Sequence, residues 1–184
     1  MKPVLVSSNP GKAREFQQLF RQHGLELEVE PLRTVEIQAD SLEEIAVFSC
    51  LQAYNILKKP VIVEDAGLFV EVLNGFPGPY SSYAYRTIGV DGLLRLVAGR
   101  PRDARFESVI AFYSPEHGMR VFRGECRGRI ADKPRGSSGF GFDPIFIPEG
   151  RDETFAEMGC SEKNVVSHRG RAARKLIAWL QEPR

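Results

Sequence analysis

Hydrophobic positions along the chain fall into two patterns: short runs that are apolar throughout, and longer stretches with helical spacing. Val4–Val6, Val61–Val63 and Ile145–Ile147 are apolar at every position, which is typical of short strands covered on both faces of a sheet. Apolar residues recur at helical spacing from Lys12 to His23 and from Ser167 to Leu180. This mixture of strands and helices predicts an α/β fold.

A second helix is predicted from Asp40 to about Lys59, because Ser41 and Glu44 form a capping box at its start. Two extended runs flank a Ser-Pro-Glu-His-Gly turn and indicate a β-hairpin, which makes the sheet a mixed one. The remaining predicted elements are a strand at Leu25–Glu30, extended chain at Leu68–Leu73, a short helix at Asp91–Ala98, and the hairpin strands Arg105–Tyr113 and Met119–Ile130.

The composition is that of one globular domain spanning residues 1–184. The 25 Lys and Arg and 24 Asp and Glu leave a net charge of +1, which disfavours a nucleic-acid binder that works by bulk charge. No apolar run reaches the ~20 residues of a membrane span, and no signal peptide is expected. Three widely spaced cysteines, Cys50, Cys126 and Cys160, are typical of reduced thiols, so we expect a cytoplasmic protein.

The first candidate site is the turn between the strand at 4–6 and the first helix. A strand that runs through a tight turn into a helix points free N–H groups and the positive end of the helix dipole at one spot. That arrangement favours a phosphate, although an ordinary capping loop with a solvated lysine fits the same residues. The residues of this turn are Ser7, Ser8, Asn9, Pro10, Gly11 and Lys12.

The second candidate site is a group of acids. Glu64 and Asp65 follow the apolar run at 61–63, where we expect them at the end of the strand. Carboxylates beside a buried strand are costly unless they are paired or bind a metal. Glu36 lies upstream, and together these acids offer oxygen ligands for a hard divalent cation. Capping acids are the alternative interpretation.

Two further segments have the composition of a ligand site. In Ser137–Pro144, the aromatic rings of Phe140 and Phe142 suit stacking on a planar base, and Asp143 or backbone groups suit reading its edge; a glycine turn with core aromatics is equally consistent. Near the last helix, Lys163, His168 and Arg169 bring cationic donors to a helix start, which favours a nearby anion. The alternative is a solvated basic face that continues through Arg171, Arg174 and Lys175.

Six short motifs follow one another along the chain. They are Ser-Ser-Asn-Pro-Gly-Lys at 7–12, Val-Glu-Asp-Ala-Gly-Leu at 63–68, Gly-Phe-Pro-Gly-Pro-Tyr at 75–80, Gly-Phe-Gly-Phe-Asp-Pro at 139–144, Thr-Phe-Ala-Glu-Met at 154–158 and Glu-Lys-Asn-Val-Val-Ser-His-Arg at 162–169. Each motif alone is weak. In this order, from Val4 to Trp179, the chain resembles the inosine triphosphate pyrophosphatase family, also called XTP/dITP diphosphatases.

The resemblance implies an elongated mixed β-sheet flanked by helices, with a substrate cleft between two lobes, and a homodimer. It implies Mg²⁺-dependent hydrolysis of ITP, dITP or XTP to monophosphate and pyrophosphate, with Mn²⁺ as an alternative ion. By family pattern Asp65 is the catalytic proton acceptor, and Glu36 and Asp65 are the metal ligands. The implied substrate-binding residues are Ser7, Ser8, Asn9, Pro10, Gly11, Lys12, Ala66, Phe140, Gly141, Phe142, Asp143, Lys163, His168 and Arg169.

The chain departs from the family pattern at three places. Ala66 stands where many relatives have Ser or Thr. Many relatives carry a lysine in the second helix, where this chain has Ser49-Cys50-Leu51, and some carry one after the Pro-Gly-Pro-Tyr turn, where this chain has Ser81-Ser82. Two other functions remain open on the residues. One is a Maf-like pyrophosphatase of pyrimidine or modified nucleotides, and the other is a non-catalytic nucleotide-binding module.

Overall fold

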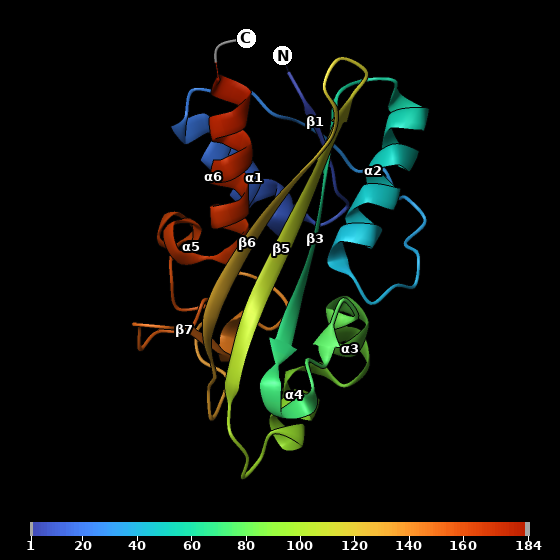
Figure 1. The fold of residues 1–184 in the computed structure, drawn as a ribbon. Coiled ribbons are helices and arrows are strands. Elements are labelled where there is room, and N and C mark those ends of the chain that lie inside the picture. The colour runs from blue at the N-terminus through green and yellow to red at the C-terminus, as the bar shows by residue number, and fades with distance from the viewer. Residues whose placement is uncertain (1, 183–184) are drawn as a thin grey trace.

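A seven-stranded mixed sheet runs along the molecule in the computed structural model, which describes residues 2–182 (Figure 1). The elements are β1 (Val4–Val6), α1 (Pro10–Gln22), β2 (Glu28–Glu30), α2 (Leu42–Leu57), β3 (Val61–Val70), the 3₁₀ turn η1 (Glu71–Leu73), β4 (Pro77–Gly78), α3 (Ser81–Thr87), α4 (Gly89–Leu96), β5 (Asp103–Ser114), β6 (Gly118–Ile130), the 3₁₀ turn η2 (Asp143–Ile145), β7 (Phe146–Pro148), α5 (Cys160–Val166) and α6 (His168–Gln181). The strand order is β2-β1-β3-β5-β6-β7, with β4 paired to β3. β1 is parallel to β2 and β3, and the other pairs are antiparallel, so the predicted α/β fold on a mixed sheet is confirmed.

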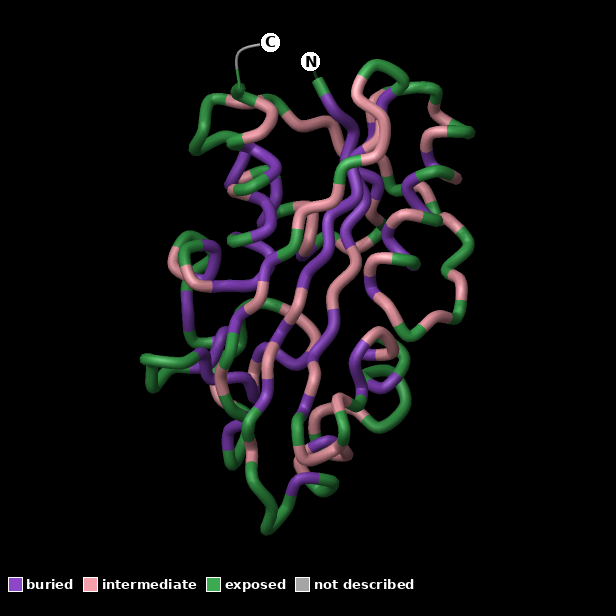
Figure 2. The backbone as a smooth tube through the Cα atoms, in the orientation of Figure 1, coloured by how far each residue is buried: buried purple, intermediate pink, exposed green. Residues whose placement is uncertain are grey.

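The upper lobe, which contains α1, α2 and α6, has helices on both faces of the sheet (Figure 1). Ile62 of β3 packs in the core under α1 and α6, whereas Val61 and Val63 pack in the core under α2. Successive residues of a strand face opposite sides, so a strand between two helical layers must be apolar at every position. Figure 2 shows the buried backbone that results along the middle of the long strands.

The lower lobe, which contains α3, α4 and β7, has a core of its own. Leu68 and Val70 of β3, Phe106 of β5 and Phe146 of β7 are buried together there. The long strands β3, β5 and β6 run through both lobes (Figure 1). Within residues 2–182, no helix is long and apolar enough to cross a membrane.

Several element boundaries differ from the prediction. The apolar run at 61–63 is the start of a ten-residue strand, because β5 continues to pair with it through Glu64 and Asp65 to Val70. The extended chain predicted beyond Val70 is the turn η1, and the strand predicted from Leu25 is ordered as β2 from Glu28. The helices α3 and α5 were not predicted, since neither seven-residue segment has a clear apolar stripe.

Candidate active site

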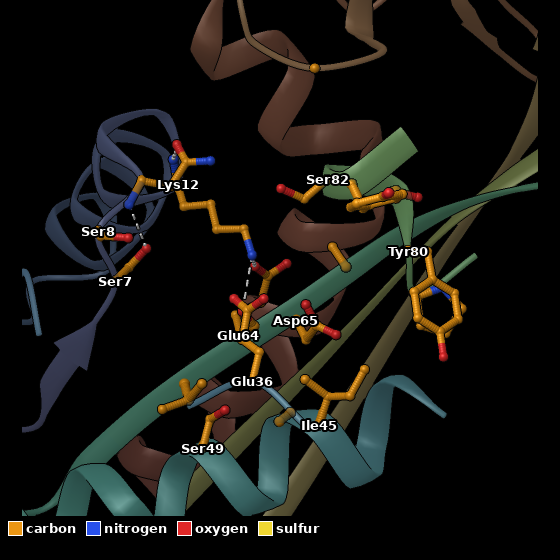
Figure 3. A pocket seen from close by; sticks show the side chains of 18 of the residues that line it. Ser7, Ser8, Lys12, Glu36, Ile45, Ser49, Glu64, Asp65, Tyr80 and Ser82 are labelled. Atoms are coloured by element: carbon orange, nitrogen blue, oxygen red, sulfur yellow. Dashed lines mark hydrogen bonds and ion pairs between the residues drawn. The ribbon is translucent and has the colours of Figure 1, made fainter. Parts of the chain in front are cut away.

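A cleft of about 1080 Å³ lies between the lobes, and parts of β1, α2, β3 and α3 line it (Figure 3). The predicted site residues in its lining are Ser7, Ser8, Asn9, Lys12, Glu36, Asp65, Ala66, Phe140, Gly141, Phe142, Asp143, His168 and Arg169. Pro10, Gly11 and Lys163 are outside the lining, the first two within the same loop and Lys163 buried beneath the cleft. The fold therefore gathers segments that are more than 100 residues apart in the chain.

The loop after β1 is organised by Asn9. Its Oδ1 accepts hydrogen bonds from the N–H of Gly11 at 2.8 Å and from the N–H of Lys12 at 3.2 Å, which makes Asn9 the N-cap of α1. A Cβ at Gly11 would overlap the ring of Phe140, so glycine allows the loop to pack directly against that ring. The capping interpretation is thus correct for Asn9, while Ser7 and Lys12 still line the cleft (Figure 3).

Asp65 lies in the middle of β3 rather than at its end, which corrects the prediction. It pairs with Val109 of β5, and the alternation of the strand places it on the α2 side, in line with Val63. Glu64 is on the opposite side, in line with Ile62. Acids are tolerated inside this strand because one faces the cleft and the other is ion-paired.

Burial raises the pKa of Asp65 to about 7; the negative charges of Glu64 and Glu36 add to this effect, and Lys12 opposes it. The Oδ2 atom of Asp65 is buried and has no hydrogen-bond partner within residues 2–182. A carboxylate with a perturbed pKa and a free oxygen at the floor of a cleft is typical of a catalytic or ligand-binding group.

Glu64 is held by three donors on the side of the sheet opposite Asp65. The Ser108 hydroxyl donates to its Oε1 at 2.7 Å and Arg169 Nε donates to the same atom at 3.1 Å. Lys12 Nζ forms an ion pair with Oε2 at 2.7 Å and donates to the backbone carbonyl of Glu64 at 3.0 Å. Burial opposes ionisation, but the charges of Arg169 and Lys12 outweigh it and keep the pKa of Glu64 well below its usual range. Glu64 is therefore an ionised anchor for two of the cations that line the cleft.

Glu15 of α1, which was not predicted from the sequence, contacts two of the predicted site residues. It is 4% exposed, and its carboxylate accepts from Lys163 Nζ at 2.7 Å and from Arg169 Nη1 at 2.6 Å. Lys163 also bonds Asp143 at 2.6 Å. The signal was an acid beside Phe16 in the apolar stripe of a helix, where an unpaired charge would be costly.

The ion pairs that Glu15 and Asp143 form with Lys163 and Arg169 change the interpretation of these two cations near the last helix. Lys163 and Arg169 were expected to meet an anion from outside the protein. Their side chains are only 3% and 2% exposed, and each is already paired with two buried carboxylates. Arg169 still lines the cleft, so its predicted substrate contact stays a prediction, but its charge is offset by the protein.

The segment around Phe140 is shaped by Asp143, whose Oδ2 accepts from the N–H of Phe140 at 2.8 Å. Phe140 is half-buried, and the cations of Lys163 and Arg169 lie 4.9 Å and 5.3 Å from the centre of its ring. Phe142 is instead buried in the core of the lower lobe. Of the two predicted stacking rings, Phe140 is therefore the one with an exposed portion on the cleft.

His168 opens α6 and is 2% exposed, with its ring stacked on Phe106 at 4.6 Å between centroids. Burial, aided by the charge of Arg169, lowers its pKa well below the usual value, so the ring is neutral. α6 comes this close to the sheet because β6 has Gly124 at the crossing point. A Cβ there would overlap the backbone of His168 and Ala172.

Glu36 and Asp65 lie near each other at the cleft, from the loop before α2 and from β3 (Figure 3). Among residues 2–182, no three His, Cys, Asp or Glu side chains are close enough together to hold a metal ion by themselves. Proteins nevertheless usually bind Mg²⁺ through only one or two carboxylates, and the ion takes its other oxygen ligands from substrate phosphates and water. The free Oδ2 of Asp65 fits such a role.

Known proteins are similar to this chain over nearly its whole length. The model of the Ham1 family matches residues 3–179. The dITP/XTP pyrophosphatase of Thermococcus kodakarensis is 50% identical over 183 residues, 99% of this chain and 98% of the relative. That of Hyperthermus butylicus is 49% identical over 180 residues, 97% of this chain and 94% of the relative. The solved structure of a Ham1 protein from Coxiella burnetii superposes with a TM-score of 0.86 at 30% sequence identity and covers 100% of both chains. The structure of the Staphylococcus aureus Ham1 protein superposes with a TM-score of 0.83 at 33% sequence identity and covers 98% of each chain.

Proposed function

Because the chain belongs to the Ham1 family, we propose that it hydrolyses dITP, XTP and ITP to the nucleoside monophosphate and pyrophosphate, removing damaged purine nucleotides. The observation that carries the proposal is the position of Asp65. The buried Oδ2 of its carboxylate has no hydrogen-bond partner within residues 2–182, and it lies in a cleft that the Ser7–Lys12 loop and the Phe140–Asp143 segment also line. The loop offers donors for the phosphates, and the segment offers the partly exposed ring of Phe140 for the base.

The residues divide the work between binding and proton transfer. Ser7, Ser8 and Lys12 supply hydroxyl and ammonium donors for the phosphates. Asp65 accepts the proton of the water that attacks the α-phosphorus, a role that its raised pKa suits near neutral pH. The β- and γ-phosphates then leave as pyrophosphate, and no covalent intermediate with the protein is needed.

Glu36 and Asp65 would hold a divalent cation, which we propose to be Mg²⁺, with Mn²⁺ as the alternative. A bound Mg²⁺ neutralises charge on phosphate oxygens and stabilises the charge that develops in the transition state. Two carboxylates offer oxygen ligands, which favour a hard oxygen-preferring ion over zinc.

The base is selected by the segment after Gly139. The backbone N–H groups of Gly141 and Phe142 donate to no acceptor within residues 2–182, and the half-buried ring of Phe140 is beside them. N–H donors match the 6-oxo group of hypoxanthine and xanthine, whereas the 6-amino group of adenine would leave two donors facing each other. Rejection of ATP follows from this arrangement.

A substrate panel with product analysis tests the proposal. ITP, dITP, XTP, dUTP and ATP are each incubated with Mg²⁺ or with EDTA, and we expect pyrophosphate from the first three with Mg²⁺ only. Preference for dUTP would favour a Maf-like pyrophosphatase, and binding without turnover would favour a nucleotide-binding module. In ¹⁸O-water, attack at the α-phosphorus places the label in the monophosphate; IDP and orthophosphate as first products would refute the assignment.

We also propose a homodimer in the cytoplasm. Cys50, Cys126 and Cys160 are free thiols, which suits a reducing compartment. The oligomeric state is measured by light scattering after size exclusion.

A further inference from the structure

The charges of the cleft fall into two groups, and the larger group is neutral as a whole. Three cations, Lys12, Lys163 and Arg169, pair with three buried acids, Glu15, Glu64 and Asp143, through contacts of 2.6–3.1 Å. The charge of each cation is therefore offset inside the protein. Lys12 and Arg169 line the cleft and can donate hydrogen bonds toward it, while their charges are largely balanced by the buried acids.

The second group consists of the charged lining residues outside that cluster. The acids are Glu36 and Asp65, which would be neutralised by a divalent cation. His168 is neutral, which leaves Arg33 and Arg86 as cations. Neither arginine forms an ion pair with any described residue. A triphosphate carries several negative charges, and these two side chains are the lining cations that are not already ion-paired within residues 2–182.

Of the two, Arg86 is better placed. Arg33 lies on the irregular segment before α2, which also carries Glu36. Arg86 lies on α3, which carries no acidic residue. It is one helical turn beyond Ser82, a residue that faces the cleft across from Lys12 (Figure 3).

Arg86 lines the cleft, as does Ser82 one helical turn before it. Residues four apart on a helix share a face, so the long side chain of Arg86 can reach the region in front of Ser82. Arg86 is exposed and makes no hydrogen bond within residues 2–182, which leaves its donors free. A guanidinium presents paired donors that match phosphate oxygens.

We propose that Arg86 is a substrate-binding residue that holds the triphosphate from the α3 wall of the cleft, opposite the Ser7–Lys12 loop. The proposal rests on the proposed function, since it assigns Arg86 to the phosphates of that substrate. Arg86 thereby adds the charge of a cation that is not ion-paired within residues 2–182 to the ion-paired Lys12 and Arg169 of the lining.

The test compares Arg86→Gln with Arg95→Gln, a matched exposed arginine on α4 that is outside the cleft lining. With ITP and Mg²⁺, we expect Arg86→Gln to raise KM about tenfold with little change in kcat, since charge-assisted hydrogen bonds are worth this much. Inhibition by pyrophosphate should weaken by a similar factor. Arg86→Lys should fall between the parent and Arg86→Gln, and Arg95→Gln should match the parent.

Two outcomes overturn the proposal. One is an Arg86→Gln variant with the KM and pyrophosphate inhibition of the parent, and the other is a raised KM with unchanged pyrophosphate inhibition, which would assign Arg86 to the base or sugar. If the parent does not hydrolyse ITP, the proposed function fails separately. Calorimetric titration with tripolyphosphate then still tests Arg86, because weaker binding to Arg86→Gln than to Arg95→Gln is expected without any turnover.

Discussion

Replacing Arg169 by Met should unbalance the buried charges of the active site. Arg169 is 2% exposed and bonds Glu15 at 2.6 Å and Glu64 at 3.1 Å. Methionine keeps much of the volume and removes the charge, so three buried acids are left with two lysines. Breaking a buried pair in this way typically costs about 3–5 kcal/mol. For a chain of this size that corresponds to a melting temperature lower by roughly 6–20 °C.

The loss should depend on pH in a defined direction. In the parent, the pKa values of Glu15 and Glu64 are lowered, so their stabilisation is present above the unfolded pKa of about 4.3 and is lost as pH falls through the folded values. Without Arg169, the folded state takes up a proton on one acid more readily. Its stability then rises as pH falls toward that unfolded pKa, and the difference from the parent narrows between pH 8 and pH 5.

Urea unfolding followed by circular dichroism at several pH values measures this difference. Arg95→Met, at an exposed arginine that forms no ion pair within residues 2–182, is the control and should stay within about 0.5 kcal/mol of the parent. The double variant Arg169→Met with Glu15→Gln restores the charge balance and should recover part of the loss. The reasoning would be refuted if the destabilisation were constant from pH 8 to pH 5. It would also be refuted if the double variant lost as much free energy of unfolding as the two single variants lose together.

Four further outcomes are expected. Asp65→Asn should lower kcat with ITP by at least about a hundredfold without loss of fold, measured by pyrophosphate release and circular dichroism. Because the pKa of Asp65 is about 7, Mn²⁺ affinity of the parent should rise between pH 6 and pH 8, followed by paramagnetic resonance of the free ion. Lys12→Ala should raise KM for ITP about tenfold or more, and unchanged calorimetric affinity would contradict the role of the loop. Gly124→Val should lower the melting temperature, since its side chain would displace the start of α6 at His168 by overpacking worth about 1–3 kcal/mol.

Much of the fold could be predicted because its signals are local. Ser41 caps α2 as the capping box indicated, with its hydroxyl accepting from the N–H groups of Glu43 and Glu44. The turn between β5 and β6 and the apolar runs of β1 and β3 each depend on a few adjacent residues. Such features are determined by residues close together in the chain, so the pattern alone predicts them.

The parts that could not be predicted depend on partners far along the chain. Helix α3 is held by Ser81, whose hydroxyl accepts from the N–H of Leu68 and donates to the carbonyl of Gly78. Lys163 meets Glu15 across 148 positions of sequence. Without that partner, Lys163 resembled a free cation facing an anion, and the buried acid that offsets it could not be identified.

The continuity of the long strands through both lobes determines how the molecule can move and unfold. Val61 and Val63 of β3 belong to the upper lobe, and Leu68 and Val70 of the same strand belong to the lower. A rigid-body hinge between lobes would have to bend this strand and its ladder to β5. We therefore expect breathing of the cleft to be confined to the walls outside the long strands, namely the segment at 31–41 and helix α3. Hydrogen exchange should accordingly reveal a single cooperative unit spanning the strands, with faster exchange only in those walls.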